Sequence, residues 1–186
     1  FAGWMVVFVL FQIYLGALVA GLHAGLSFNT WPLMDGSIWP GGLLTIDPAW
    51  LNLFENPKTV QFAHRLGAYA LFGLSLWHMI AVRRADPGSA HARRAMHLFA
   101  LILAQAAIGI TTLVMVVPFG WALLHHGFAM VVLSAAIKAI PADIVEAARL
   151  DGINPWQMFT RVTLPSIRPA LIVVVVTISI GTLKVF

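Results

Sequence analysis

The chain has 186 residues, of which 60% are hydrophobic and only 10% are charged, with 11 Lys and Arg against 7 Asp and Glu. Ordinary soluble domains contain about 25% charged residues, so this composition argues against a soluble domain and indicates a protein that spans a lipid bilayer. The basic residues flank apolar segments, which argues against nucleic-acid binding. Because there is no cysteine, disulfides, thiolate metal sites and a cysteine nucleophile are excluded.

Five apolar segments are long enough to cross the hydrocarbon core. They are residues 1–26, 59–82, 97–117, 121–140 and 170–186. The sequence begins and ends inside such segments, so we expect a fragment of a longer protein, with the fifth segment truncated. The predicted fold is an all-α integral membrane protein, in which a four-helix transmembrane bundle is followed by a cytoplasmic helical loop and the truncated fifth transmembrane helix.

The connection between the first two segments, residues 27–58, is rich in Trp, Pro and Gly. Its tryptophans suit the headgroup level of a bilayer. Residues 49–54 are expected to form a short interfacial helix that ends at Asn56-Pro57. Basic residues concentrate at 83–94 and 138–168, which predicts that these two stretches are cytoplasmic and that residues 27–58 are external.

An internal similarity links the first and third segments. Residues 12–16 (QIYLG) resemble residues 105–109 (QAAIG), and each is followed, after a connection, by a segment with a histidine near its start. Two similar helical hairpins of this kind would pair into a four-helix bundle.

Two of the seven histidines are the strongest candidates for a site. His64 and His125 lie near the outer ends of segments that run inward, at depths that differ by about 1.5 Å, one helical residue. Two imidazoles at matched depth could ligate a haem iron from opposite sides, or each could hydrogen-bond a neighbouring helix. His23 and His126 also lie near the outer face, whereas the histidines near the inner ends are expected to be solvated: His78, His91 and His97.

Nearby residues allow two interpretations each. Arg65 could donate to a haem propionate or extend to a lipid phosphate. The small residues Ala17, Gly21 and Gly25, which recur every four positions, permit close approach either of a helix or of a flat macrocycle.

Several motifs in residues 1–135 give the chain a family resemblance. They are residues 15–25 (LGALVAGLHAG), 29–36 (NTWPLMDG), 55–56 (EN), 60–65 (VQFAHR) and 123–126 (LLHH). This series resembles the carboxy-terminal half of the heme A synthases, oxidoreductases of the bacterial inner membrane that convert a methyl group of heme O to the formyl group of heme A.

The resemblance implies that residues 1–135 form a four-helix half-bundle that holds heme b. It maps the iron ligands onto His64 and His125, with His126 as the alternative to His125 because the family usually has Gln at that place. Gln61 stands where the motif of the amino-terminal half has a Glu. We therefore expect the chain to work with a missing amino-terminal half or as a homo-oligomer, and not to complete the oxidation alone.

The remaining residues, 136–186, resemble a different family. The motifs EAA at 146–148, DG at 151–152 and VTLP at 162–165 resemble the cytoplasmic signature loop of sugar-type ABC importer permeases. The resemblance implies a loop, residues 141–165, that docks on an ABC ATPase subunit. The residues implied in docking are Glu146, Ala147, Ala148, Gly152, Leu164 and Pro165. The alternative functions are therefore a permease component of an importer, or a non-functional chimera of two genes; we expect no working transport.

Overall fold

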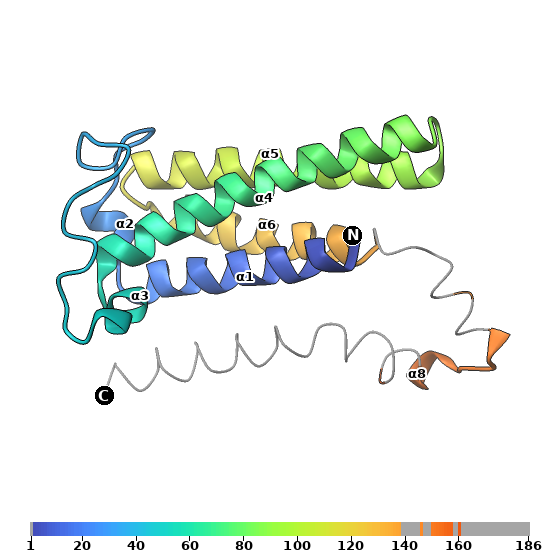
Figure 1. The fold of residues 1–186 in the computed structure, drawn as a ribbon, viewed down its shortest axis with the longest axis horizontal. Coiled ribbons are helices and arrows are strands. Elements are labelled where there is room, and N and C mark those ends of the chain that lie inside the picture. Colours follow the sequence, from blue (N-terminus) through green and yellow to red (C-terminus); the bar gives the residue numbers. More distant parts are fainter. Residues whose placement is uncertain (1, 139–145, 147–149, 158–159, 161–186) are drawn as a thin grey trace.

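A computed structural model describes residues 2–138, 146, 150–157 and 160. Four long helices make up most of this part (Figure 1). They are α1 (Ala2–Gly21), α4 (Pro57–Ala85), α5 (Ala90–Val114) and α6 (Phe119–Lys138). The shorter elements are α2 (Ala24–Ser27), the 3-10 helix η1 (Ala49–Leu51), α3 (Asn52–Glu55) and α8 (Pro155–Gln157).

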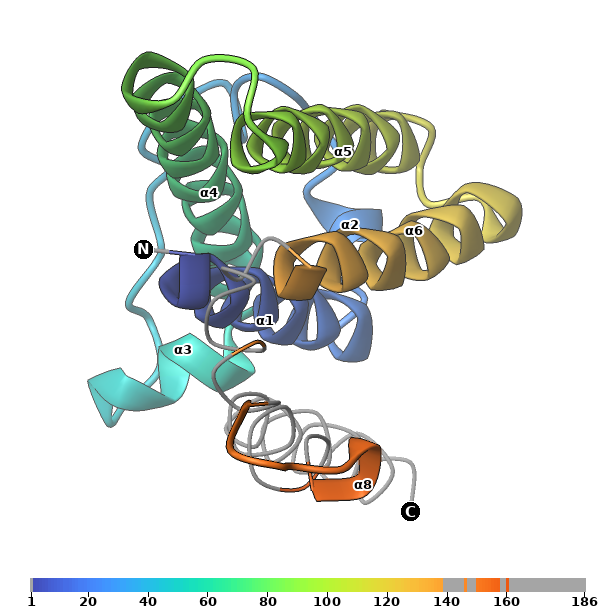
Figure 2. The same cartoon turned by 90° about the vertical axis from the view of Figure 1, so that its right-hand side faces the viewer.

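The four long helices alternate in direction and form a closed ring (Figure 2). Around the ring α1 packs on α4, α4 on α5, α5 on α6, and α6 on α1. Helices α4 and α6 are therefore diagonal partners, as are α1 and α5. All four are long and apolar enough to cross a membrane, which confirms the prediction of an all-α membrane protein with a four-helix bundle.

The interior of the bundle changes character along its length. An apolar cluster fills the half that contains the start of α1 and the end of α6, with Met5, Val9, Leu98, Ile102 and Val132 among its members. Large apolar side chains such as Trp77 and Leu103 are exposed on the outside, as expected where lipid is the solvent. The polar side chains of the candidate site lie in the other half of the bundle, nearer the connection between α2 and α4.

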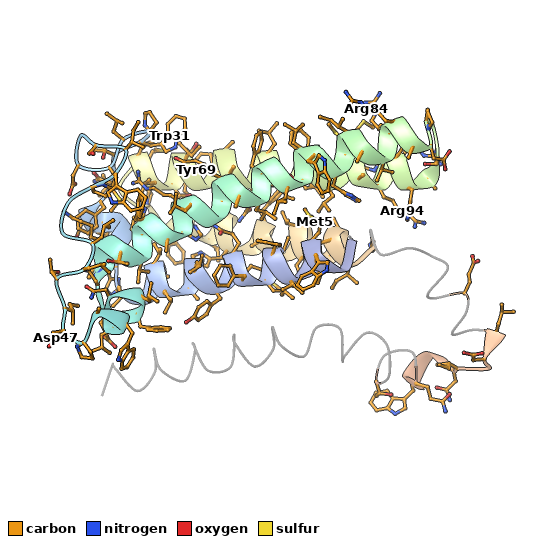
Figure 3. The ribbon with its side chains drawn as sticks, viewed as in Figure 1. Met5, Trp31, Asp47, Tyr69, Arg84 and Arg94 are labelled. Atoms are coloured by element: carbon orange, nitrogen blue, oxygen red, sulfur yellow. The ribbon has the colours of Figure 1, made fainter. Side chains whose placement is uncertain are left out.

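The two ends of the bundle carry different side chains. Arg84 and Arg94 lie at the end where α4 meets α5, whereas Trp31 and Asp47 lie at the opposite end (Figure 3). This arrangement matches the charge pattern on which the predicted orientation rests, with the arginine end toward the cytoplasm; that orientation stays a prediction.

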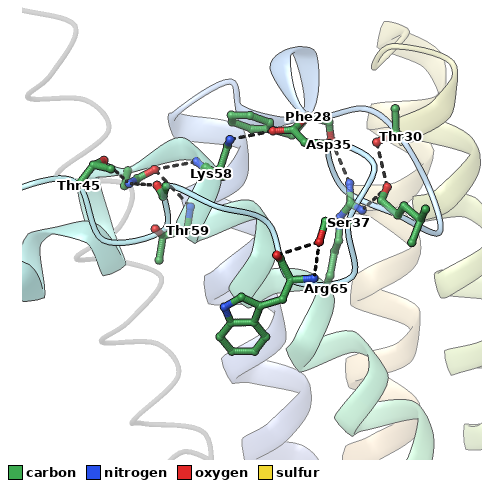
Figure 4. A network of polar contacts seen from close by, with 12 residues as sticks. Phe28, Thr30, Asp35, Ser37, Thr45, Lys58, Thr59 and Arg65 are labelled. Atoms are coloured by element: carbon green, nitrogen blue, oxygen red, sulfur yellow. Dashed lines mark hydrogen bonds and ion pairs between the residues drawn. The ribbon is translucent and has the colours of Figure 1, made fainter.

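The connection between α2 and α4 is held to the start of α4 by two buried asparagines. Asn52 bonds both backbone groups of Ile46, donating to the carbonyl at 2.7 Å and accepting from the amide at 3.0 Å. Asn56 caps α4 by accepting from the amides of Lys58 and Thr59, and its amide group donates to the carbonyls of Gly42 and Leu43. Figure 4 shows part of this network. The loop is thus an ordered cover over one end of the bundle.

Most predicted boundaries agree with the helices within a few residues. The first predicted segment is divided, because His23 adopts a left-handed backbone conformation (φ 51°) between α1 and α2. The predicted interfacial helix appears as η1 and α3, and Pro57 begins α4. The fifth segment, residues 170–186, lies outside the described residues, and the division of the chain at residues 135–136 stays a prediction.

Candidate functional site

His64 lies on α4 against the face of α1. The amide nitrogen of Gln12 donates to the His64 carbonyl oxygen at 2.9 Å and lies 3.0 Å from Nδ1 of the ring. One turn further along α1, Gly16 faces the same ring: a Cβ at this position would lie 3.2 Å from His64 Cε1. Glycine at position 16 therefore lets the imidazole pack directly against the α1 backbone.

His125 has the same surroundings on α6. The amide nitrogen of Gln105, on α5, donates to the His125 carbonyl oxygen at 3.0 Å. Gly109, one turn further along α5, faces the ring, and a Cβ there would lie only 2.7 Å from His125 Cε1. In both hairpins, a glutamine and a glycine four residues apart on the earlier helix hold the histidine of the later helix.

These contacts explain the internal similarity between residues 12–16 and 105–109. The sequence alone indicated two similar hairpins, but it assigned no role to the glutamines or glycines. Of the small residues singled out from spacing, Gly25 serves helix packing, since a Cβ there would lie 3.0 Å from Val117 Cγ2. In the sequence, only the repeat of residues 12–16 at 105–109, together with the histidine that follows each copy, indicated these contacts.

The two histidines lie at corresponding positions near the starts of two diagonal helices. His64 is seven residues beyond Pro57, and His125 is six residues beyond Phe119, the first residues of α4 and α6. At about 1.5 Å per residue, these positions differ by about 1.5 Å along the helices. A ligand in the middle of the ring would thus meet one histidine on each side.

The residues present fit a haem in two respects. Each imidazole is backed by a glycine, which leaves room for the ring beside the preceding helix. Within the described part of the chain, several buried polar atoms at this level lack a hydrogen-bond partner, among them Gln12 Oε1, Gln105 Oε1 and His125 Nδ1. Buried polar atoms without a hydrogen-bond partner are rare in protein interiors. The described residues contain no group of three or more His, Cys, Asp or Glu that could hold a metal ion.

Arg65 is buried, with 8% of its surface exposed, and it holds the outer loop. Its guanidinium donates to the carbonyl oxygens of Phe28 at 3.0 Å and Leu33 at 3.4 Å (Figure 4). Arg65 Nε is buried and has no partner among the described residues. The side chain thus lies between the histidine level and the loop, and it does not extend to the bundle surface as a lipid-binding arginine would.

The other candidate histidines face away from the bundle. His126 is exposed, and its Nδ1 lies 2.6 Å from the Ala122 carbonyl oxygen of its own helix. His23 is exposed at the junction of α1 and α2. Of the neighbouring pair on α6, the geometry therefore favours His125 as the inward-facing residue.

Only parts of the predicted docking loop are described. Glu146 and Gly152 are exposed, and Gly152 has a left-handed backbone conformation (φ 75°). Asn154 and Gln157 bond each other's backbone amides at the start of α8, which is the reciprocal pattern of a capping box. Four of the predicted contacts lie outside the described residues: Ala147, Ala148, Leu164 and Pro165.

Comparison with known proteins places the bundle in a family. Residues 1–137 match the family model COX15-CtaA, described as cytochrome oxidase assembly protein. The chain is 68% identical over 136 residues to a heme A synthase of Rhizobium meliloti (strain 1021) and 67% identical over 136 residues to one of Sinorhizobium medicae (strain WSM419). Each match covers 73% of this chain and 37% of the relative. No solved structure matches.

These matches have different consequences for the two parts of the chain. The family model ends at residue 137, so the resemblance of residues 136–186 to ABC permeases gains no support from it and stays a prediction. The bacterial relatives and the four apolar helices indicate a multi-pass bacterial membrane protein. Since the family model covers most of the sequence, the chain belongs to the COX15-CtaA family of cytochrome oxidase assembly proteins.

Proposed function

We propose that residues 1–137 form the haem-binding half-bundle of a heme A synthase, in which His64 and His125 would hold the iron of a b-type haem. The observation that carries this proposal is the placement of the two histidines. They lie at corresponding positions on diagonal helices, and each is held by a glutamine and a glycine of the preceding helix. Two buried histidines with unrelated roles would not each need a glutamine and a glycine on the preceding helix.

The haem would lie in the middle of the ring of four helices, between the two proposed ligands. When bound, haem supplies one-electron redox chemistry. The chain's own residues would bind and orient it: the histidines would hold the iron, and the apolar cluster in the other half of the bundle would exclude water from that side. Arg65 Nε, buried beneath the outer loop, is the proposed donor to a propionate.

Heme A synthesis itself is proposed for a larger assembly. The chain spans 37% of the length of the heme A synthases that it matches. We propose that oxidation of the heme O methyl group takes place in a part of those proteins that lies outside this sequence. Residues 1–137 would then hold a haem that is distinct from the heme O substrate, and would work beside an amino-terminal half or a second copy of this chain.

The test is spectroscopic. The chain is expressed in a haem-sufficient bacterial host and purified in detergent, and the absorption of the reduced and oxidised protein is recorded with the haem content. The wild type and His126→Ala should show the same low-spin spectrum. His64→Ala and His125→Ala should each lose it. Loss in His126→Ala with retention in His125→Ala would transfer the ligand role to His126, and a wild type without haem would contradict the proposal.

The tail offers a second, separate function, docking on an ABC ATPase through residues 141–165. Its support is the exposure of Glu146 and Gly152. A pull-down of purified sugar-importer ATPase subunits by the chain tests it, and binding should be lost in Glu146→Ala. Solute-stimulated ATP hydrolysis in proteoliposomes would make transport the primary function.

A further inference from the structure

In each glutamine that contacts a histidine, the amide nitrogen donates a hydrogen bond but the amide oxygen accepts none from the described residues. Gln105 Nε2 donates to the His125 carbonyl oxygen at 3.0 Å. Its Oε1 is buried and has no donor among the residues that the structure describes, and the same is true of His125 Nδ1. A buried acceptor and a buried ring nitrogen therefore occur on two side chains that are already joined through a backbone hydrogen bond.

Gln12 repeats this arrangement. Its Nε2 donates to the His64 carbonyl oxygen at 2.9 Å, which fixes the orientation of the amide, because a carbonyl oxygen can only accept. Its Oε1 is buried without a donor in the described part of the chain and lies against Gly67. The same Nε2 is 3.0 Å from His64 Nδ1 and 3.5 Å from His64 Nε2. An amide N–H that donates to Nδ1 requires the ring proton on Nε2.

A histidine that binds iron through Nε2 needs the opposite tautomer. Its Nε2 lone pair goes to the metal, and Nδ1 then carries the proton and needs an acceptor. Nδ1–H and the Gln12 Nε2–H would both be donors and could no longer bond each other. The only acceptor that the same amide offers is Oε1, which has no other partner among the described residues.

We propose that Gln12 and Gln105 are positioning residues for the two ligand histidines: each amide nitrogen holds the histidine's carbonyl oxygen, and each Oε1 accepts the Nδ1 proton once Nε2 faces the iron. This inference rests on the proposed haem site and deepens it. No bond to the haem is made by either glutamine. They act through the histidines, by fixing the tautomer and the direction of the ring.

Two consequences follow from an acceptor on Nδ1–H. It makes the imidazole a stronger electron donor and so stabilises ferric over ferrous haem. Loss of the acceptor should raise the reduction potential. Loss of such outer partners also typically weakens metal-site affinity about 10- to 100-fold. Removal of a mere packing contact would lower protein stability but leave the potential unchanged.

The experiment compares haem-loaded full-length variants in detergent. Gln105→Leu removes the acceptor and the amide donor with little change in volume. Gln105→Glu keeps an acceptor oxygen in either protonation state. Thr112→Val is the matched control, because Thr112 Oγ1 also lies within hydrogen-bond distance of an α6 backbone carbonyl, that of Trp121 at 3.2 Å, besides the Ile108 carbonyl of its own helix at 2.8 Å. It makes no hydrogen bond with His125. Reduction potential, haem dissociation constant and thermal unfolding are measured for each.

The expected results differ by variant. Gln105→Leu should raise the potential and weaken haem binding about 10- to 100-fold, whereas Gln105→Glu should have a potential at or below that of the wild type. Thr112→Val should lower only the unfolding temperature. A wild-type potential in Gln105→Leu, an equal shift in Thr112→Val, or a raised potential in Gln105→Glu would overturn the inference. If Gln105→Leu does not fold, Gln12→Leu and Gln105→Glu decide the question. A wild type without haem would refute the proposed function instead.

Discussion

Replacement of Gly109 by alanine is the most local perturbation of the proposed site. The added Cβ would lie 2.7 Å from Cε1, 3.2 Å from Nδ1 and 3.4 Å from Nε2 of His125. Favourable contacts between such atoms need about 3.5–4.0 Å. The α5 backbone cannot yield without disturbing its packing on α4 and α6. The His125 ring must therefore move by about 1 Å, away from α5.

The expected cost can be worked from this clash. Overpacking of this size costs about 1–3 kcal/mol, while alanine in place of glycine within a helix returns about 0.5–1 kcal/mol. The net loss of folding stability is therefore small, about 0–2.5 kcal/mol. The stability that alanine adds to the helix does not strengthen haem binding. If the cost falls on the ligand histidine, the dissociation constant rises about 5- to 140-fold.

Other glycines of the same bundle provide matched controls. Gly16→Ala should have a smaller effect on haem binding, because its Cβ would lie 3.2 Å from His64 Cε1. Gly127, on α6, and Gly73, on α4, have no described atom within 4 Å of an added Cβ. Alanine at either position should leave haem affinity unchanged and stabilise the helix slightly.

The assay is a titration of haem-depleted protein in detergent with haemin, followed by absorption of the bound haem. The predicted order of dissociation constants is Gly109→Ala above Gly16→Ala, with Gly127→Ala and Gly73→Ala equal to the wild type. A wild-type constant for Gly109→Ala, or an equal loss in all four variants, would refute the reasoning that the glycines make room for ligand histidines.

Four further predictions concern the outer loop, the topology and the tail. Asn56→Ala should lower the free energy of unfolding by about 1–3 kcal/mol, since it removes a helix cap and a buried amide; thermal unfolding measures this. Lys58→Ala should cost at most about 1 kcal/mol, because the 2.7 Å ion pair with Asp35 is half-exposed. A cysteine at Ser89 should be labelled from the cytoplasmic side only, and outside labelling alone would reverse the orientation. Truncation after Lys138 should leave the haem spectrum unchanged.

Much of the fold could be predicted from the sequence, because a membrane span must satisfy its backbone within one helix. Hydropathy therefore located the four long helices, but it placed the start of α4 at residue 59. Asn56-Pro57, which was predicted only to end the interfacial helix, also caps and begins α4. The break at His23 was not predicted, because a left-handed non-glycine residue leaves no compositional signal. The asparagine network of the loop was also missed, since its partners are backbone carbonyls.

The candidate site was only partly predictable. Helical rise gives the matched depth of His64 and His125, but sequence does not reveal which helices are diagonal, because that depends on how the ring closes. The residues around the histidines were accessible only through the repeat. Gln12 and Gln105 lie on other helices than the histidines that they contact, and only the packed bundle brings them together.

The central claim is that one haem iron is bound by His64 and His125. The most direct measurement is electron–nuclear double resonance on the ferric protein, prepared with ¹⁵N-labelled histidine and natural-abundance haem. We predict two coupled histidine nitrogens in the wild type and in His126→Ala, and a single one in either His64→Ala or His125→Ala. A wild-type iron with one histidine nitrogen or none, or an unchanged pair in His125→Ala, would contradict the account.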